Sequence, residues 1–208
     1  EPEGPGGGRD VRAADHWVAA GEFEEALEPL RRAAKHFGEK VHDFRRQREI
    51  LERRAEVLER CGVPESDPRY LRNRYEWARN MWKRGEAERA EATALRLSER
   101  AEEFGLAGTV ADAELLLAAV RGAHGDKPER VAAHIDRAEG LYSEVGDEEG
   151  LAEALKERAE LRYDAGEFDR ARQLFRRAAE EADRLGLQTR RRGAQWNAGG
   201  WGPGAGAG

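Results

Sequence analysis

Two stretches of the chain carry nearly the same sequence. Residues 20–38 read AGEFEEALEPLRRAAKHFG, and residues 165–183 read AGEFDRARQLFRRAAEEAD. Aligned without a gap, they share AGEF, one alanine and the whole of RRAA. A sequence that recurs inside one chain predicts a structural unit that is built more than once.

The turn that opens both stretches also recurs between them. A glycine followed by an acidic residue stands at Gly21, Gly85, Gly125 and Gly166, which are 64, 40 and 41 residues apart. Between these turns, apolar residues follow in steps of three and four, as in Ala87, Ala90, Ala94, Leu97, Ala101 and Phe104. Such a pattern predicts amphipathic helices, and stacked neighbours have to cover their apolar faces.

The composition favours helices along most of the chain. Of the 208 residues, 39% are hydrophobic and 38% are charged, and alanine, leucine, glutamate and arginine dominate residues 9–187. These are strong helix formers, whereas β-branched residues are few. We therefore expect an all-α fold, an α-solenoid of antiparallel helix pairs with about nine helices.

Charge and cysteine content limit the classes of partner. The 36 basic and 42 acidic side chains are finely mixed and give a net charge of -6, unlike the clustered basic surface of a nucleic-acid binder. Cys61 has no second cysteine to pair with, and neither a membrane span nor a secretion signal is visible. We expect a cytoplasmic protein that does not contact a membrane. The chain begins at Glu1 instead of methionine, which favours a piece of a longer protein or a processed product.

The repeated motif resembles the tetratricopeptide repeat family. The family's turn and second helix match Gly21, Phe23, Ala26, Leu30 and Ala33, and the match recurs later in the chain. The recurring positions are Gly166, Phe168, Ala171, Phe175 and Ala178, with weaker copies at Gly85, Ala90, Ala94 and at Gly125, Asp126, Ile135, Ala138. The resemblance covers about residues 9–186 and implies stacked helix pairs.

Repeats of about 40 residues are longer than the family's usual length of about 34. Residues 141–172, LYSEVGDEEGLAEALKERAELRYDAGEFDRAR, resemble the long-repeat variety found in bacterial signal-transduction ATPases and actinobacterial transcription regulators. The resemblance implies a non-enzymatic adaptor or sensor domain that binds a protein or peptide. Two alternatives stay open: a regulatory arm excised from a larger ATPase or regulator, and weak nucleic-acid binding through the C-terminal tail.

The long first interval predicts one extra helix. It exceeds the next interval by about 24 residues, which places an inserted helix over Glu39–Arg60. Because neighbouring helices alternate in direction, one inserted helix should reverse the phase of the repeats. We expect a Gly-rich leader over residues 1–8, a pair with the inserted helix over 9–60, three pairs over 67–187, and a flexible tail over 188–208. An irregular five-helix run is the competing interpretation.

In the tetratricopeptide repeat family, ligands lie in a groove lined by the first helix of each pair. The corresponding positions here are Arg72, Tyr75, Arg79, Trp82 and Lys83, then Asp112, Leu115, Ala119 and Ala123, then Glu153, Lys156, Glu160, Tyr163 and Asp164. Such a groove is basic and aromatic at one end and acidic at the other, which suits a peptide of mixed charge. In the alternative interpretation, Arg72 and Arg79 are only solvated and Trp82 is core.

Tyr75 and Arg79 stand where the family's carboxylate clamp has lysine and asparagine, so a chaperone-tail receptor is not expected. The five histidines lack metal-binding spacing, and neither a phosphate loop nor a nucleophile elbow occurs. We expect no enzyme activity, no metal and no cofactor. The sequence predicts no oligomeric state.

The tail combines three arginines, Arg190–Arg192, with Trp196 and Trp201 among glycines. Aromatic side chains with basic neighbours can stack on single-stranded nucleic acid. They can also cover the free end of a solenoid or lie in its groove as an intramolecular partner. Plain disorder is the third interpretation, and all three stay open.

Overall fold

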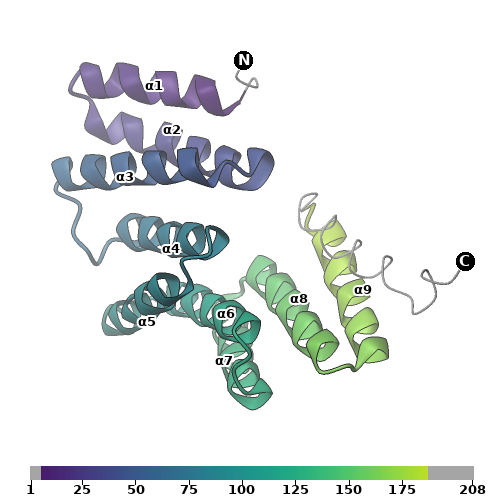
Figure 1. Ribbon diagram of the computed structural model, residues 1–208. Helices are drawn as coiled ribbons and strands as arrows, with labels where there is room; N and C mark the ends of the chain where they lie inside the picture. Colours follow the sequence, from purple (N-terminus) through teal and green to yellow (C-terminus); the bar gives the residue numbers. More distant parts are fainter. Residues whose placement is uncertain (1–5, 187–208) are drawn as a thin grey trace, which may run out of the picture. The chain divides into compact units, whose positions relative to one another are not determined.

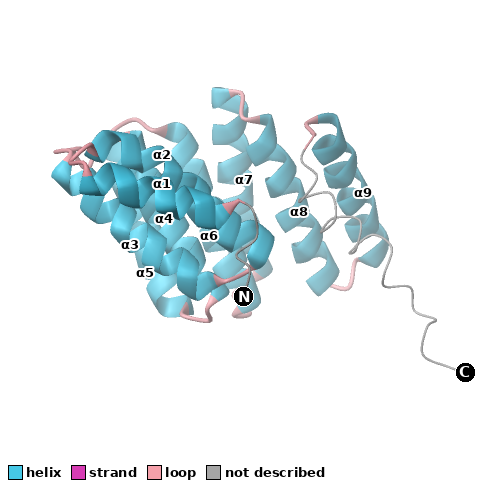
Figure 2. Cartoon of the chain, turned by 90° about the horizontal axis from the view of Figure 1, so that it is seen from above, coloured by secondary structure: helices cyan, strands magenta, loops and turns pink. Residues whose placement is uncertain are grey.

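The computed structural model describes residues 6–186, and every element in this range is helical (Figures 1 and 2). The all-α fold expected from the composition is confirmed for these residues. They form nine α-helices and one π-helix, which are α1 (Gly7–Ala19), α2 (Phe23–Lys35), η1 (His36–Val41), α3 (Phe44–Arg60), α4 (Pro68–Lys83), α5 (Ala87–Glu103), α6 (Ala107–Ala123), α7 (Pro128–Val145), α8 (Glu148–Asp164) and α9 (Phe168–Arg184).

The four motif glycines end helices, as the sequence predicts. Gly21, Gly85, Gly125 and Gly166 have φ angles of 80°, 80°, 74° and 76°, in the left-handed region that a side chain disfavours. The next N–H reaches back to the carbonyl five residues earlier; the Glu22 N–H donates to Trp17 O at 2.9 Å. This is the Schellman arrangement, which satisfies carbonyls at the end of the helix.

The chain divides into two compact units, Glu1–Phe104 and Gly105–Gly208. The first contains α1 to α5 and the second contains α6 to α9. This division differs from the boundary at residues 60–67, which was inferred from the phase of the repeats. α3 ends at Arg60 and α4 begins at Pro68, and α4 and α5 are grouped with the N-terminal helices.

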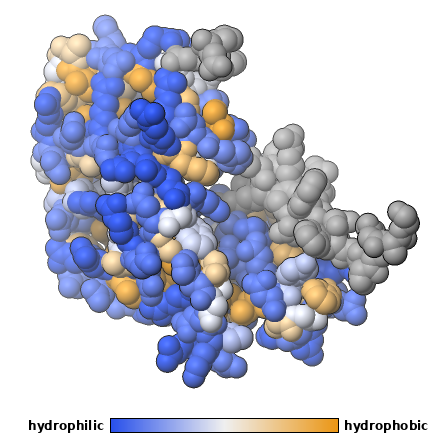
Figure 3. Space-filling model, in the orientation of Figure 1, coloured by the Kyte–Doolittle hydropathy of each residue, from blue (hydrophilic) through white to orange (hydrophobic). Residues whose placement is uncertain are grey.

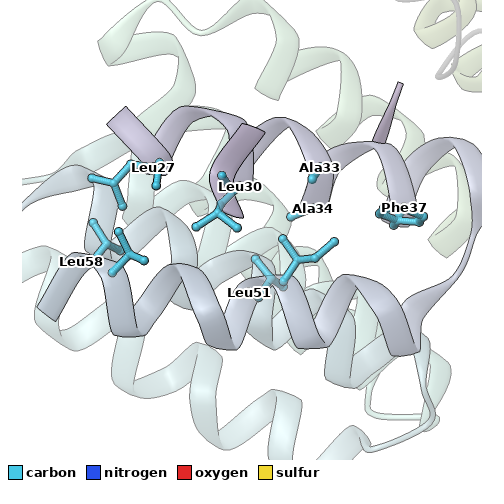
Figure 4. Close-up of a cluster of buried hydrophobic side chains, with 11 residues drawn as sticks. Leu27, Leu30, Ala33, Ala34, Phe37, Leu51 and Leu58 are labelled. Atoms are coloured by element: carbon cyan, nitrogen blue, oxygen red, sulfur yellow. The ribbon is translucent and has the colours of Figure 1, made fainter. Parts of the chain in front are cut away.

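The core of the first unit lies where α1, α2 and α3 meet. Figure 4 shows Leu30 on α2 facing Leu51 and Leu58 on α3. The motif alanines Ala26 and Ala33 are fully buried beside them. Because each buried leucine side chain contributes about 1.5–3 kcal/mol, the repeated motif supplies much of this core.

The inserted helix begins later than expected. Residues 36–41 extend α2 as a π-helix, and α3 starts at Phe44, where the Asp43 carboxylate accepts the Arg46 N–H at 2.9 Å. Gly38 in this π-helix packs against α3, and a Cβ there would clash with the buried Gln47 amide. Val41, at the end of the π-helix, is 51% exposed.

A buried polar seam joins α3 to α4. Arg54 donates from Nη1 to the Asn73 side-chain oxygen at 3.1 Å and to the Arg69 carbonyl at 3.2 Å. Its Nε donates to the Leu27 carbonyl of α2 at 3.4 Å, and Glu24 of α2 pairs with Arg69 of α4. α2 and α4 contact each other, and both accept hydrogen bonds from Arg54. Both helices therefore lie on the side of α3 that carries Arg54.

The second unit packs in the same manner. Ala111, Leu115 and Ala118 of α6 contact Ile135 and Tyr142 of α7, together with Val131, Ala138 and Ala154. Gly150 at the start of α8 lies so close to the Tyr142 ring that a Cβ would clash.

The motif residues of α9 are also core residues of this unit. Phe175 and Ala171 pack against Ala159 of α8, and Ala178 packs with Leu155. These positions correspond to Leu30, Ala26 and Ala33 in the first copy.

Candidate functional site

One surface of α4 gathers three of the predicted groove residues. Tyr75 follows Arg72 by three residues and precedes Arg79 by four, so the three side chains share a helix face. The guanidinium carbons of Arg72 and Arg79 lie 5.0 Å and 5.6 Å from the centre of the Tyr75 ring. We call these three residues with Glu76 the α4 stripe.

Glu76 lies between both arginines of the α4 stripe. Its carboxylate is 3.2 Å from Arg72 Nη2 and 3.7 Å from Arg79 Nη1. The Arg72 side chain is 50% exposed and that of Arg79 is 31% exposed. The stripe therefore presents two guanidinium groups, an aromatic ring and one carboxylate to solvent, with a net charge of +1.

Two residues of α2 extend this charged surface. Arg31 donates to both carboxylate oxygens of Glu28 at 2.7 Å, and this hydrogen bond is the main cause that raises the pKa of Arg31. The Arg72 charge opposes the shift, since Arg31 and Arg72 are close enough to repel each other. Arg31 and Glu28 were not predicted as site residues, because nothing in the repeat pattern places α2 beside α4.

Trp82 and Lys83 stand at the C-terminal end of α4. Trp82 is half-buried, and Lys83 is exposed as the last residue of the helix. Figure 3 shows apolar side chains as separate islands among hydrophilic ones on the face it presents. The Tyr75 ring beside Arg72 and Arg79 is therefore a candidate contact point for a partner.

The predicted residues of α6 are used within the fold. Leu115 is 5% exposed and packs against α7, so it lies in the core and offers almost no surface. The Asp112 carboxylate accepts the Tyr142 hydroxyl at 2.9 Å. Both residues lie on α6, the helix that the family's groove positions indicate. Most side chains of this helix are buried.

Four charged residues form a second surface on α8, which we call the α8 cluster. The Lys156 ammonium is 3.3 Å from Glu153, 3.2 Å from Glu157 and 3.4 Å from Glu160. Burial lowers the pKa of Lys156, but the three carboxylates outweigh it and raise the pKa overall. With all groups ionised the cluster carries a net charge of -2.

Glu157 is the member of the α8 cluster that sequence reasoning missed. Its side chain is 13% exposed, and burial is the main cause that raises its pKa to about 7. The sequence offers a weak signal, because Glu157 adjoins Lys156 in a chain rich in carboxylates. Burial, which singles it out, is a property of the folded chain.

The remaining predicted residues fall at the end of α8 or outside the described range. Tyr163 contacts Phe168 edge to face, with ring centres 5.3 Å apart, and Asp164 is exposed. Trp196 and Trp201 lie outside the described residues. The predicted site residues thus separate into the α4 stripe in one unit and the α8 cluster in the other.

Within residues 6–186, no group of three or more histidine, cysteine, aspartate or glutamate side chains could hold a metal ion. Across the same range, none of the helices combines the length and the apolar character that a membrane crossing demands.

Comparison with known proteins identifies the fold. No protein-family model and no curated protein sequence matches the chain. Among solved structures, BtubC (BKLC) from P. vanneervenii is similar with a TM-score of 0.62 at 19% identity, over 92% of this chain and 82% of that one. Aspartyl phosphate phosphatase F from Bacillus subtilis is similar with a TM-score of 0.63 at 13% identity, over 92% and 54%.

A third similar structure is a signal transduction ATPase with numerous domains that has a tetratricopeptide repeat sensor, from Pyrococcus horikoshii. Its TM-score is 0.57 at 16% identity, over 91% of this chain and 31% of that protein. The chain therefore spans about a third of this protein and about half of the phosphatase. At these identities the likeness establishes the fold, and the resemblance to tetratricopeptide repeat proteins is confirmed at that level.

Proposed function

We propose that this chain is a non-enzymatic interaction module that binds a peptide or protein segment through the α4 stripe. The observation that carries the proposal is the half-buried Tyr75 ring between the exposed Arg72 and the half-buried Arg79 on a helical repeat fold. Arginine and tyrosine are among the residues that supply most of the binding energy in protein interfaces.

The chemistry of the α4 stripe favours a ligand that carries carboxylates. A guanidinium can hold a carboxylate with two parallel hydrogen bonds, and the Tyr75 ring offers apolar area between two such groups. Glu76 already accepts from this pair, so a ligand carboxylate would compete with it. The α8 cluster lies in the other unit and has the opposite sign, so it would attract basic groups.

We assign Glu157 and Lys156 a structural role and not a catalytic one. A carboxyl group with a pKa near 7 can serve in proton transfer. Here Glu157 is mostly buried and touches a lysine that two further glutamates also contact. This is the pattern of an ion cluster that fixes a helix surface.

Selection of peptides from a random library on the immobilised protein tests this function. The strongest selected peptide is then titrated against the wild type and against an Arg72→Glu/Arg79→Glu variant. Arg176→Glu/Arg177→Glu is the matched control, because both arginines are exposed on α9 and the change in charge is the same.

We expect the α4 variant to lose at least about tenfold in affinity and the α9 control to keep the wild-type affinity. Equal affinity of both variants would refute the α4 stripe as the site. Circular dichroism spectra that match the wild type establish that both variants fold.

A sensor arm of a larger protein is the second candidate function. It is favoured by the signal transduction ATPase from Pyrococcus horikoshii, in which a similar fold accompanies other parts of a longer chain. The intact mass of the native protein in the source organism tests this candidate. A mass near 23.3 kDa would contradict it, and a much larger mass would support it.

Nucleic-acid binding by Arg190–Arg192, Trp196 and Trp201 stays a prediction on residues outside the described range. It requires an affinity for single-stranded DNA that falls steeply with salt concentration. The cytoplasmic location stays a prediction that rests on the single cysteine.

A further inference from the structure

A pocket of about 380 Å³ opens between α4 and α5. Leu71 and Met81 of α4 and Leu97 of α5 are buried and form its apolar wall, and Trp77 lines it as a half-buried ring. Arg74 and Arg96 are exposed at its edge. We call this the α4–α5 pocket, and its volume lies in the lower part of the range of ligand sites, about 300–1,000 Å³.

The α4–α5 pocket is separate from the α4 stripe. Among its lining residues, Arg74, Trp77 and Met81 follow in steps of three and four along α4. Trp77 stands two residues after Tyr75, which is a rotation of about 200° around a helix. The pocket and the stripe therefore occupy nearly opposite faces of α4, and a change in one leaves the other in place.

The charge of the α4–α5 pocket is unbalanced. Its three arginines face one carboxylate, Glu65, which is held by Arg100 at 2.8 Å. Arg74 donates to the Tyr70 hydroxyl at 2.7 Å, and Arg96 has no hydrogen bond or ion pair with any side chain of residues 6–186. The lining therefore carries a net charge of +2.

Within residues 6–186, Arg74 and Arg96 have no carboxylate partner, and they lie beside an apolar wall; together these features define the chemistry of a ligand that would fit. Many arginines of the first unit already hold a carboxylate of the chain, as Arg32 holds Asp10 at 2.9 Å. A ligand carboxylate at Arg74 and Arg96 would supply what the described residues do not. An adjacent apolar side chain would cover Leu71, Met81 and Leu97.

We propose that the α4–α5 pocket binds an acidic peptide segment of a partner protein, with one apolar side chain on Leu71 and Leu97 and carboxylates on Arg74 and Arg96. Residues 187–208 contain three arginines and no aspartate or glutamate, so this chain's own tail has the wrong charge. Residues 1–5 contain two glutamates but no large apolar side chain.

The test measures fluorescence anisotropy of a short labelled peptide with a central leucine flanked by aspartate and glutamate residues. A second peptide has serine in place of leucine, and a third has lysine in place of the acids. The protein variants are Arg74→Glu/Arg96→Glu for the pocket and Arg72→Glu/Arg79→Glu for the α4 stripe. A third variant, Thr93→Leu, fills the pocket without changing its charge, since Thr93 lines it.

We expect saturable binding of the leucine peptide and at least about tenfold weaker binding in the Arg74/Arg96 variant. In the Arg72/Arg79 variant, whose α4 stripe no longer attracts carboxylates, saturable binding to the pocket should persist. Thr93→Leu should also weaken it, whereas the serine peptide should bind weakly and the lysine peptide not at all. Three results would overturn the proposal. The leucine peptide could show no saturable binding, the serine peptide could bind as tightly as the leucine peptide, or binding could be lost only in the Arg72/Arg79 variant. The last result would leave the proposed function of the α4 stripe intact, so the two failures are distinguishable.

Discussion

Replacing Glu157 by glutamine should stabilise the protein at neutral pH. Burial raises the pKa of Glu157 from 4.5 to about 7 in the folded chain, against the opposing charge of Lys156. Between these two pH values the unfolded chain loses a proton that the folded chain retains, so the unfolded state is favoured. The stability that this group contributes is present below pH 4.5 and is lost as the pH rises to about 7.

The size of the effect follows from the difference between the two pKa values. The difference of roughly 2.5 between the two pKa values, at about 1.4 kcal/mol for each, corresponds to an upper limit of about 3–4 kcal/mol. Glutamine keeps the shape of the side chain but does not ionise, and Lys156 keeps Glu153 and Glu160 as partners. The variant and the wild type should therefore be equally stable near pH 4.5 and should diverge by up to about 3–4 kcal/mol by pH 8.

Urea unfolding followed by circular dichroism at a series of pH values measures this difference. Glu180→Gln is the matched control, because Glu180 is exposed on α9 and the change in charge is the same. The control should follow the wild-type profile at every pH. A Glu157→Gln profile that runs parallel to the wild type from pH 4.5 to 8 would refute the reasoning from burial.

Three further predictions concern the packing of the repeats. Leu30→Ala and its counterpart Phe175→Ala should each cost about 2–5 kcal/mol of unfolding free energy in urea, and a cost below 1 would contradict their core roles. Gly166→Ala should lower the melting temperature because φ is 76°, whereas Gly140→Ala, in open space on α7, should raise it; the reverse order would contradict the turn geometry. Asn80→Leu should cost about 1–3 kcal/mol in urea, since Asn80 of α4 donates to the Phe44 carbonyl and to the Gln47 side-chain oxygen of α3; no loss would contradict these two hydrogen bonds.

The sequence predicts well those features that depend on local chemistry. Gly21 and Gly166 signal left-handed helix ends, because a turn of this kind needs a residue without Cβ. Leu30 and Phe175 signal the apolar face of a helix through their spacing, and both are buried.

The features that the sequence does not predict depend on contacts between residues far apart in the chain. The π-helix at residues 36–41 brings Gly38 against the Gln47 amide of α3, a contact that no periodicity in the sequence displays. Arg54 carries a charge, which predicts an exposed side chain, yet it is buried because Asn73 and two carbonyls accept from it. The α4–α5 pocket likewise needs Trp77 and Arg96 to be brought together by folding.

Photo-crosslinking at Tyr75 tests the central claim most directly. A benzophenone side chain is placed at position 75 in one variant and at Ala92, exposed on α5, in another, and both are irradiated in cells of the source organism. We expect a discrete partner protein, identified by mass spectrometry, that is linked at position 75 and not at position 92. The same proteins at both positions, or no crosslinked protein at position 75, would contradict an interaction site on the α4 stripe.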